Sequence, residues 1–175
     1  LARYFNSFDK KVAGYDKNAT VITDALKSEG CEIFFEDNPQ KIPKTHLKSE
    51  DTVVIYTPAV PSEHLQLTYF RSNNFLVLKR SEVLGLITRF NKALCVAGTH
   101  GKTTTSAMIA HVLSQTDFQC SAFLGGISTN FDSNVLVNQN SDWTVVEADE
   151  FDRSFLHLSP YSSIVTAMDP DHLDI

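Results

Sequence analysis

The segment LCVAGTHGKTTTSAMIAHVL, residues 94–113, limits most strongly what this chain can fold into. An apolar run leads into Gly98, Gly101 and Lys102, and a helical pattern follows through three consecutive threonines. Glycines let backbone N–H groups converge on an anion, and a helix N-terminus adds a favourable dipole. The segment therefore predicts a strand, a phosphate-binding turn and a helix within an α/β unit.

The residues of this turn have specific expected roles. Lys102 can neutralise the β- and γ-phosphates of a nucleotide, and the Thr103 hydroxyl can bind Mg²⁺. The spacing is the shorter G-T-H-G-K-T form, because the first glycine of the commoner motif falls on Val96 here. The alternative is a helix entry whose glycine and threonines are ordinary caps. The strand before and the helix after the turn favour nucleotide binding.

Acidic residues follow the next apolar run. In TVVEADEFD, Glu147 comes directly after a buried segment, and Asp149 and Glu150 lie close behind it. A carboxylate at the end of a neighbouring strand can hold the metal that bridges ATP phosphates. Glu147 is the best placed, with the other two acids as competitors. The alternative is a solvated acidic loop.

A second acidic cluster, MDPDHLDI, ends the last apolar run and contains Asp169, Asp171, His172 and Asp174. A histidine in an acidic loop is usually a surface residue. However, the turn and both acidic clusters follow consecutive expected strands, and open α/β sheets bind ligands at the carboxyl ends of their strands. This placement favours one shared site. His100, inside the turn, can contact phosphate or substrate.

Short apolar runs alternate with amphipathic segments along the chain, which is typical of a parallel sheet covered on both faces. We place a domain boundary near Asn91, where the turn-containing unit begins. The opening helix, residues 1–8, has no strand before it. The expected strands are residues 11–16, 31–35, 52–57, 75–80, 92–98, 142–150 and 162–169, with 120–126 as a strand or loop. The expected helices are residues 18–30, closed by Gly30, and 62–74, 81–91 and 102–115.

Composition excludes several classes of protein. The net charge is −6 with no cluster of lysine and arginine, so tight binding to a nucleic-acid backbone is not expected. The apolar runs are too short to span a bilayer. The three cysteines are widely spaced and match neither a disulfide framework nor a zinc site, which favours the cytoplasm. Nucleophile-elbow and Cys–His signatures are missing from the sequence.

Three segments, GTHGKTTT, EADEFDRSFLHLSP and DPDHLDI, in this order and spacing resemble the Mur ligases of peptidoglycan synthesis. The opening, ARYFNSFDKKVAGYD, is also similar to the UDP-binding domain of that family just after its glycine-rich first turn. The resemblance implies a Rossmann-like, parallel-sheet UDP-substrate domain over residues 1–91, lacking its first strand and glycine-rich turn. It also implies an incomplete P-loop-type ATPase domain over residues 92–175. The amino-acid-binding C-terminal domain of the family is expected to be absent.

The resemblance also implies an activity. Mur ligases use ATP and Mg²⁺ to form an acyl phosphate, which an amine then attacks to give an amide. The histidine in GTHGK, the EAD box and SFLHL favour the member that joins L-alanine to UDP-N-acetylmuramate. The ligase that recycles murein tripeptide is the alternative within the family. Outside this reaction class, the open alternatives are a P-loop kinase or GTPase, although no N-K-x-D motif is present, and a non-catalytic nucleotide- or UDP-sugar-binding module.

The resemblance assigns roles to particular residues. Lys102 stabilises charge on the transferring phosphoryl group, Thr103 and Glu147 hold one Mg²⁺, and Glu147 and His172 hold a second beside the acceptor carboxylate. Asp16, at the end of the expected strand 11–16, is in position to contact the uridine nucleotide. The residues expected to wrap the ATP phosphates are Gly98, Thr99, His100, Gly101, Lys102, Thr103 and Thr104.

Overall fold

The computed structural model describes residues 1–169, apart from the side chains of residues 151 and 152. The chain forms two compact units, Leu1–Arg80 and Ser81–Ile175. The contacts therefore divide the chain after Arg80, the first residue of the helix that ends at Phe90, whereas sequence patterning predicts the boundary after that helix, near Asn91. Among the described residues, every helix is too short or too polar to cross a membrane.

The first unit has two parallel strand pairs with helices between their strands. One pair is β1 (Ala13–Tyr15) with β2 (Glu32–Phe34), and the other is β3 (Val53–Tyr56) with β4 (Leu76–Lys79). The pairs are two separate sheets rather than one continuous Rossmann-like sheet. The helical segments are α1 (Ala2–Ser7), α2 (Val21–Ser28) and α3 (Leu65–Ser72), with 3₁₀ turns η1 (Pro39–Lys41) and η2 (Lys44–His46).

Helix α2 lies within the predicted helix 18–30 and begins three residues later than predicted. Thr20 and Thr23 form a reciprocal capping box, in which the Thr20 hydroxyl accepts from the Thr23 amide at 3.2 Å and the Thr23 hydroxyl accepts from the Thr20 amide at 2.8 Å. At the other end, Gly30 has φ +92° and donates to the Lys27 carbonyl. That backbone is the left-handed helix cap that glycine adopts most readily, so the predicted stop at Gly30 is confirmed.

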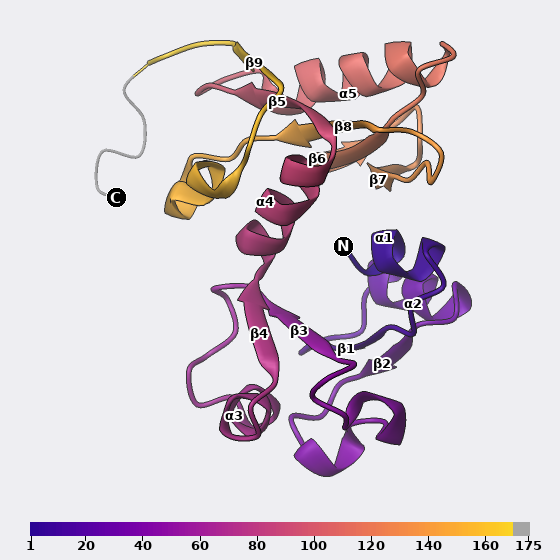
Figure 1. Ribbon diagram of the computed structural model, residues 1–175, viewed down its shortest axis with the longest axis vertical. Helices are drawn as coiled ribbons and strands as arrows, with labels where there is room; N and C mark the ends of the chain where they lie inside the picture. Colours follow the sequence, from indigo (N-terminus) through magenta and orange to yellow (C-terminus); the bar gives the residue numbers. More distant parts are fainter. Residues whose placement is uncertain (170–175) are drawn as a thin grey trace. The chain divides into compact units, whose positions relative to one another are not determined.

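The second unit is built on a five-stranded sheet with the order β7-β6-β8-β5-β9 (Figure 1). The strands β5, β6, β8 and β9 run parallel, and β7 pairs antiparallel with β6. The expected α/β fold with parallel sheets is confirmed, and 120–126 is a strand. The antiparallel strand was not predicted. The strands are β5 (Lys92–Ala97), β6 (Ser121–Ser128), β7 (Ser133–Leu136), β8 (Trp143–Glu147) and β9 (Ser162–Val165).

Helices flank this sheet. Helix α5 (Lys102–Ser114) lies along one face, and α4 (Arg80–Phe90) lies on the other side of the sheet (Figure 1). A 3₁₀ segment, η3 (Phe151–His157), leads from β8 towards β9. Gly85 allows α4 to approach this segment, because a Cβ there would lie 3.1 Å from the His157 carbonyl carbon. Thr88 fixes the same contact by accepting a 3.0 Å hydrogen bond from the Ser159 amide.

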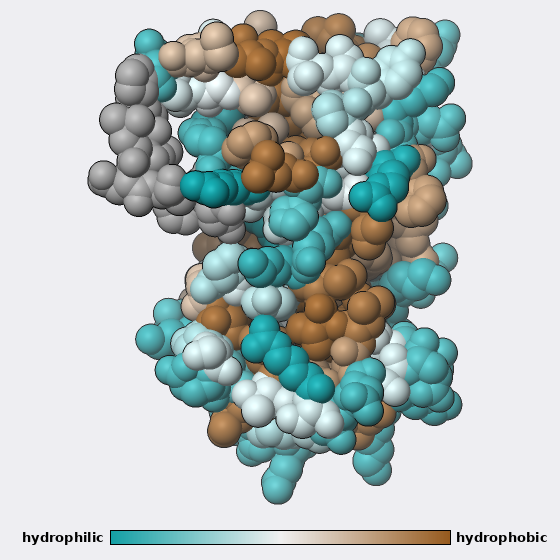
Figure 2. Space-filling model, turned by 60° about the vertical axis from the view of Figure 1, so that its left-hand side comes forward, coloured by the Kyte–Doolittle hydropathy of each residue, from teal (hydrophilic) through white to brown (hydrophobic). Residues whose placement is uncertain are grey.

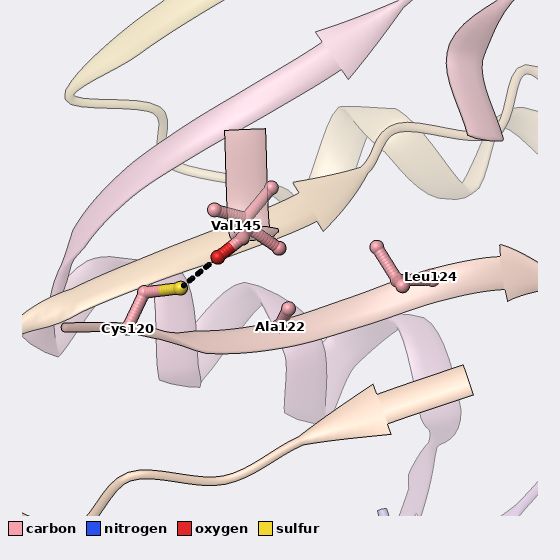
Figure 3. Close-up of a cluster of buried hydrophobic side chains, with 5 residues drawn as sticks. Cys120, Ala122, Leu124 and Val145 are labelled. Atoms are coloured by element: carbon pink, nitrogen blue, oxygen red, sulfur yellow. Dashed lines mark hydrogen bonds between the residues drawn. The ribbon is translucent and has the colours of Figure 1, made fainter. Parts of the chain in front are cut away.

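The core of the second unit lies between α5 and the sheet (Figure 3). Its buried members are Ala110, Cys120, Ala122, Leu124 and Val145. The Cys120 thiol donates to the Ala110 carbonyl with an Sγ···O distance of 3.6 Å, and this joins β6 to α5. Small side chains at these positions let the helix lie close to the sheet, which fixes the start of α5 relative to the strand ends.

The sheet is less covered at its β9 edge than at its centre. Val96 and Val145, on the central strands, have no exposed surface, whereas Ile164 and Val165 on β9 are about half exposed. Exposed apolar side chains also occur elsewhere on the surface, and one face of the molecule shows brown apolar patches beside teal polar ones (Figure 2). The central strands thus provide the rigid part of the sheet, and the candidate site lies at their carboxyl ends.

Candidate nucleotide-binding site

The turn between β5 and α5 has the backbone that a phosphate-binding loop requires. Gly98 has φ +122° and Gly101 has φ +80°, both in the region that favours glycine. Gly101 is the N-cap of α5, and no side chain of the described part of the chain caps this helix. The first-turn N–H groups of a 13-residue helix therefore face the turn with a favourable dipole for an anion.

Lys102 is held inside the turn rather than extended into solvent. Its Nζ donates to the Gly98 carbonyl at 2.7 Å and lies 2.9 Å from both carboxylate oxygens of Glu150. The lysine side chain is only 13% exposed, and the Glu150 side chain is 28% exposed. Such a partly buried ion pair holds the ammonium group in one place, at the mouth of the loop.

Glu147 contacts the other side of the turn. The Thr103 hydroxyl donates to Glu147 Oε1 at 3.0 Å, and the Gly125 amide donates to Oε2 at 2.8 Å. A Cβ at Gly125 would lie 2.6 Å from the Glu147 carboxyl carbon, so only glycine leaves room for this carboxylate. Strands β5 and β8 are parallel neighbours with Val96 opposite Glu147, which brings the carboxylate beside the loop.

These groups surround one pocket of about 320 Å³. Its lining contains most of the loop residues that the sequence predicts, together with Glu147. The lining residues are Thr99, His100, Gly101, Lys102, Thr103, Thr104 and Glu147. The structure therefore brings the expected phosphate-loop residues and the expected metal-binding carboxylate together at the carboxyl edge of the sheet.

The loop is also attached to the segment that follows β9. The Thr99 amide donates to the Ala167 carbonyl at 3.1 Å, and the Asp169 amide donates to the Thr99 hydroxyl at 3.2 Å. The Thr166 hydroxyl contacts the His100 carbonyl. His100 and Asp169 are both largely exposed, and the imidazole Nε2 lies 3.9 Å from the carboxylate. Sequence reasoning placed Asp169 near the site but did not predict these contacts.

The predicted roles of His172 and Asp16 stay predictions. His172, with Asp171 and Asp174, lies outside the described residues, so its metal-binding role stays a prediction. Asp16 follows β1 in the first unit, where its Oδ1 accepts from the Asn18 amide at 3.1 Å and its amide donates to the Phe34 carbonyl. Its proposed uridine contact likewise stays a prediction.

The structure distinguishes two acids that the sequence left as competitors. Glu147 is bound by Thr103 and Gly125, whereas Glu150 is paired with Lys102. The difference arises because β8 ends at Glu147 and the chain then turns into η3, which directs the two side chains to different sides of the loop. The role of Gly125 was missed, although the pair of glycines in FLGG was its sequence signal.

Protein-family models match both parts of the chain. The model described as "Mur ligase family, catalytic domain" matches residues 1–92, and the model described as "Mur ligase middle domain" matches residues 96–175. The first of these matches covers more than half of the chain. The chain belongs to the Mur ligase family.

Curated relatives include proteins named UDP-N-acetylmuramate–L-alanine ligase. The one from Porphyromonas gingivalis (strain W83) is 56% identical over all 175 residues, and the one from Cytophaga hutchinsonii is 48% identical over 178 aligned residues. In both comparisons the whole chain is covered, but it spans only 38% of the relative. This Mur ligase chain therefore corresponds to a little over a third of those proteins.

Solved structures of two ligases are similar to this chain. The UDP-N-acetylmuramate-alanine ligase of Thermotoga maritima matches with a TM-score of 0.82 and 30% identity, covering 99% of this chain and 40% of that one. A second ligase, from Neisseria meningitides, acts on L-alanyl-gamma-D-glutamyl-meso-diaminopimelate according to its name. It matches with a TM-score of 0.83 at 22% identity, covering 99% of this chain and 58% of that one, which supports the fold alone.

Proposed function

We propose that this chain is part of an ATP-dependent amide-bond ligase of peptidoglycan precursor synthesis that joins L-alanine to UDP-N-acetylmuramate. The observation that carries the proposal is the arrangement of Lys102, Thr103 and Glu147 around one pocket at the start of α5. The names of relatives that are about half identical over the whole chain support the choice of substrates. The recycling ligase of murein tripeptide has weaker support, because its structural likeness is at low sequence identity.

The loop would bind and orient the triphosphate of ATP. The N–H groups at the start of α5 can bind an anion, and the ammonium group of Lys102 supplies a positive charge beside them. Binding would require Lys102 to exchange its contact with Glu150 for the phosphates. With the phosphates in place, Lys102 would stabilise the charge that develops as the γ-phosphoryl group is transferred.

The residues also fit a magnesium ion. Thr103 supplies a hydroxyl oxygen and Glu147 two carboxylate oxygens, and Mg²⁺ prefers oxygen ligands of this kind. When bound, the ion neutralises phosphate charge and brings two anionic reactants together. Glu147 and Thr103 would hold the first ion, and Glu147 with His172 the second. Gly125 orients the Glu147 carboxylate for this role through its amide.

The proposed reaction has two steps. A carboxylate oxygen of the UDP-N-acetylmuramate lactyl group attacks the γ-phosphorus, and ADP leaves. The uncharged amine of L-alanine then attacks the acyl carbon. The nitrogen loses one proton to solvent, and the tetrahedral intermediate expels phosphate to leave the amide. We assign the UDP-substrate to residues 1–91, with Asp16 as a uridine contact, and ATP to residues 92–175. Cytoplasmic localisation fits these substrates.

Calorimetric titration of the full-length protein tests this proposal. We expect separate binding of UDP-N-acetylmuramate and of Mg·ATP, and we expect Lys102→Ala to weaken only the second. Binding of both ligands without any amino-acid-dependent turnover would instead support a non-catalytic binding module. Binding of neither ligand would contradict the proposed function.

A further inference from the structure

The phosphate loop and the segment after β9 leave the sheet side by side. Strands β5 and β9 are parallel neighbours, and Ala97 pairs with Val165 at their carboxyl ends. The ladder continues beyond the strands, because the Thr166 amide donates to the Ala97 carbonyl at 3.0 Å and the Thr99 amide donates to the Ala167 carbonyl at 3.1 Å. The loop therefore shares its backbone hydrogen bonds with this segment.

Gly98 makes this close approach possible. A Cβ at Gly98 would lie 2.8 Å from both the amide nitrogen and the carbonyl oxygen of Ala167, and would overlap the Thr166 hydroxyl. Glycine at this position thus has two functions, since its φ of +122° shapes the loop and its missing side chain admits the neighbouring segment. The loop and the segment pack as one piece.

One side chain extends the attachment to Asp169. Beyond the backbone hydrogen bond to Ala167, the Asp169 amide donates to the Thr99 hydroxyl at 3.2 Å. Unlike the backbone contacts, this one depends on the identity of residue 99. Valine has nearly the same shape as threonine but cannot accept the hydrogen bond, and serine can.

We propose that Thr99 is a positioning residue whose hydroxyl fixes the segment 166–169 against the ATP loop. This inference rests on the proposed function, because Asp169 lies three positions before His172 in the sequence, and His172 is proposed to hold the acceptor-side metal together with Glu147. Through its contact with Asp169, Thr99 holds the segment that precedes His172 against the loop that carries Lys102 and Thr103. Small misplacements of reacting groups reduce rates steeply, so loss of the attachment acts on turnover rather than on nucleotide affinity.

The test compares Thr99→Val with Thr99→Ser in the full-length protein. We expect Thr99→Val to lower kcat about tenfold or more and to raise the Mg²⁺ concentration for half-maximal rate several-fold. The Kd for Mg·ATP should change by less than about threefold. Thr99→Ser, which keeps the hydroxyl, should recover most of the kcat and most of the magnesium response that Thr99→Val loses.

Hydrogen exchange gives a readout that does not depend on catalysis. In Thr99→Val without ligands, the Asp169 amide should exchange faster, whereas the amide of residue 99, which is bonded to Ala167, should change little. Thr99→Ala provides a second variant if the branched side chain disturbs folding. Equal kinetics for the valine and serine variants, or an unchanged Asp169 amide, would overturn the proposal. A Kd for Mg·ATP that rises in proportion to the fall in kcat would also overturn the proposal, because the hydroxyl would then act on the nucleotide. None of these results would affect the proposed function, which fails only if the unsubstituted protein lacks the activity.

Discussion

Thr103 and Glu147 are joined by a 3.0 Å hydrogen bond between the first turn of α5 and the end of β8. The two residues are 44 positions apart in the sequence. Parallel pairing of β5 with β8 brings them together, and the Gly125 amide holds the second carboxylate oxygen. Two oxygen-bearing side chains thus lie together at the edge of the pocket, an arrangement that would suit the proposed phosphoryl transfer.

Lys102→Ala is expected to lower turnover of the full-length enzyme by about two to three orders of magnitude, because a preorganised charge aimed at the transferring group is lost. Steady-state phosphate release measures this. Lys44→Ala, which removes an exposed lysine of the first unit, is the matched control and should stay within about twofold. Near-normal turnover of Lys102→Ala would remove the lysine from the mechanism.

Glu147→Gln is expected to raise the Mg²⁺ concentration needed for half-maximal turnover, because a neutral amide is a poorer ligand for a hard cation than a carboxylate. A magnesium titration at saturating substrates measures the change. The glutamine keeps the size of the side chain, but its single carbonyl oxygen can accept from Thr103 or from Gly125, whereas the two carboxylate oxygens accept from both. If the magnesium dependence is unchanged, Glu150 becomes the better candidate for the metal ligand.

Glu150→Gln should have a different effect. Its carboxylate competes with phosphate for Lys102, so removing the charge is expected to tighten binding of Mg·ATP by about three- to tenfold while leaving the magnesium requirement unchanged. Calorimetry on the full-length protein measures the Kd. Weaker nucleotide binding would show that Glu150 supports the bound state rather than opposing it.

Gly125→Ala is expected to displace the Glu147 carboxylate, since a Cβ would lie 2.6 Å from its carboxyl carbon. The variant should reproduce the raised magnesium requirement of Glu147→Gln without altering any metal ligand. Gly126→Ala is the matched control, because a Cβ there would meet the Thr103 methyl group at an acceptable 3.4 Å. Identical magnesium titrations for the two alanine variants would argue against this steric role.

The two buried cysteines of the second unit make a prediction about alkaline pH. Burial raises the pKa of the thiols of Cys95 and Cys120 from 9.0 to about 11. Between these values the unfolded chain loses the thiol protons and the folded chain keeps them, so stability falls as pH rises from about 9 to about 11. Thermal unfolding of the full-length protein across this range should show a shallower decline for a Cys95→Ala, Cys120→Ala double variant. If the unfolding temperatures of the two proteins decline equally with pH, the raised thiol pKa values would be contradicted.

Local signals in the sequence were sufficient to predict most elements of the second unit. The apolar run of β5, the two glycines and Lys102 predicted a strand, turn and helix, and the structure contains all three. These features depend on neighbouring residues: buried strands read as apolar runs, and glycine marks backbone that other residues rarely adopt. The carboxylate of Glu147 was also placed at the end of an apolar strand, and Glu147 is the last residue of β8.

Contacts between distant segments were not predictable in the same way. The pairing of Lys102 with Glu150 and the attachment of Thr99 to Asp169 join residues 48 and 70 positions apart. Which acid of EADE meets the lysine depends on how the chain turns from β8 into η3, and sequence periodicity carries no signal for that turn. The antiparallel strand β7 was also missed, because it is only four residues long and only partly apolar.

Phosphate release by the full-length protein, supplied with UDP-N-acetylmuramate and Mg·ATP and with the amine substrate varied, tests the central claim most directly. If the pocket formed by Lys102, Thr103 and Glu147 activates the muramyl carboxylate, release will depend on L-alanine and will be nearly abolished in Lys102→Ala. Release that murein tripeptide stimulates but L-alanine does not, or that continues undiminished in Lys102→Ala, would contradict the account.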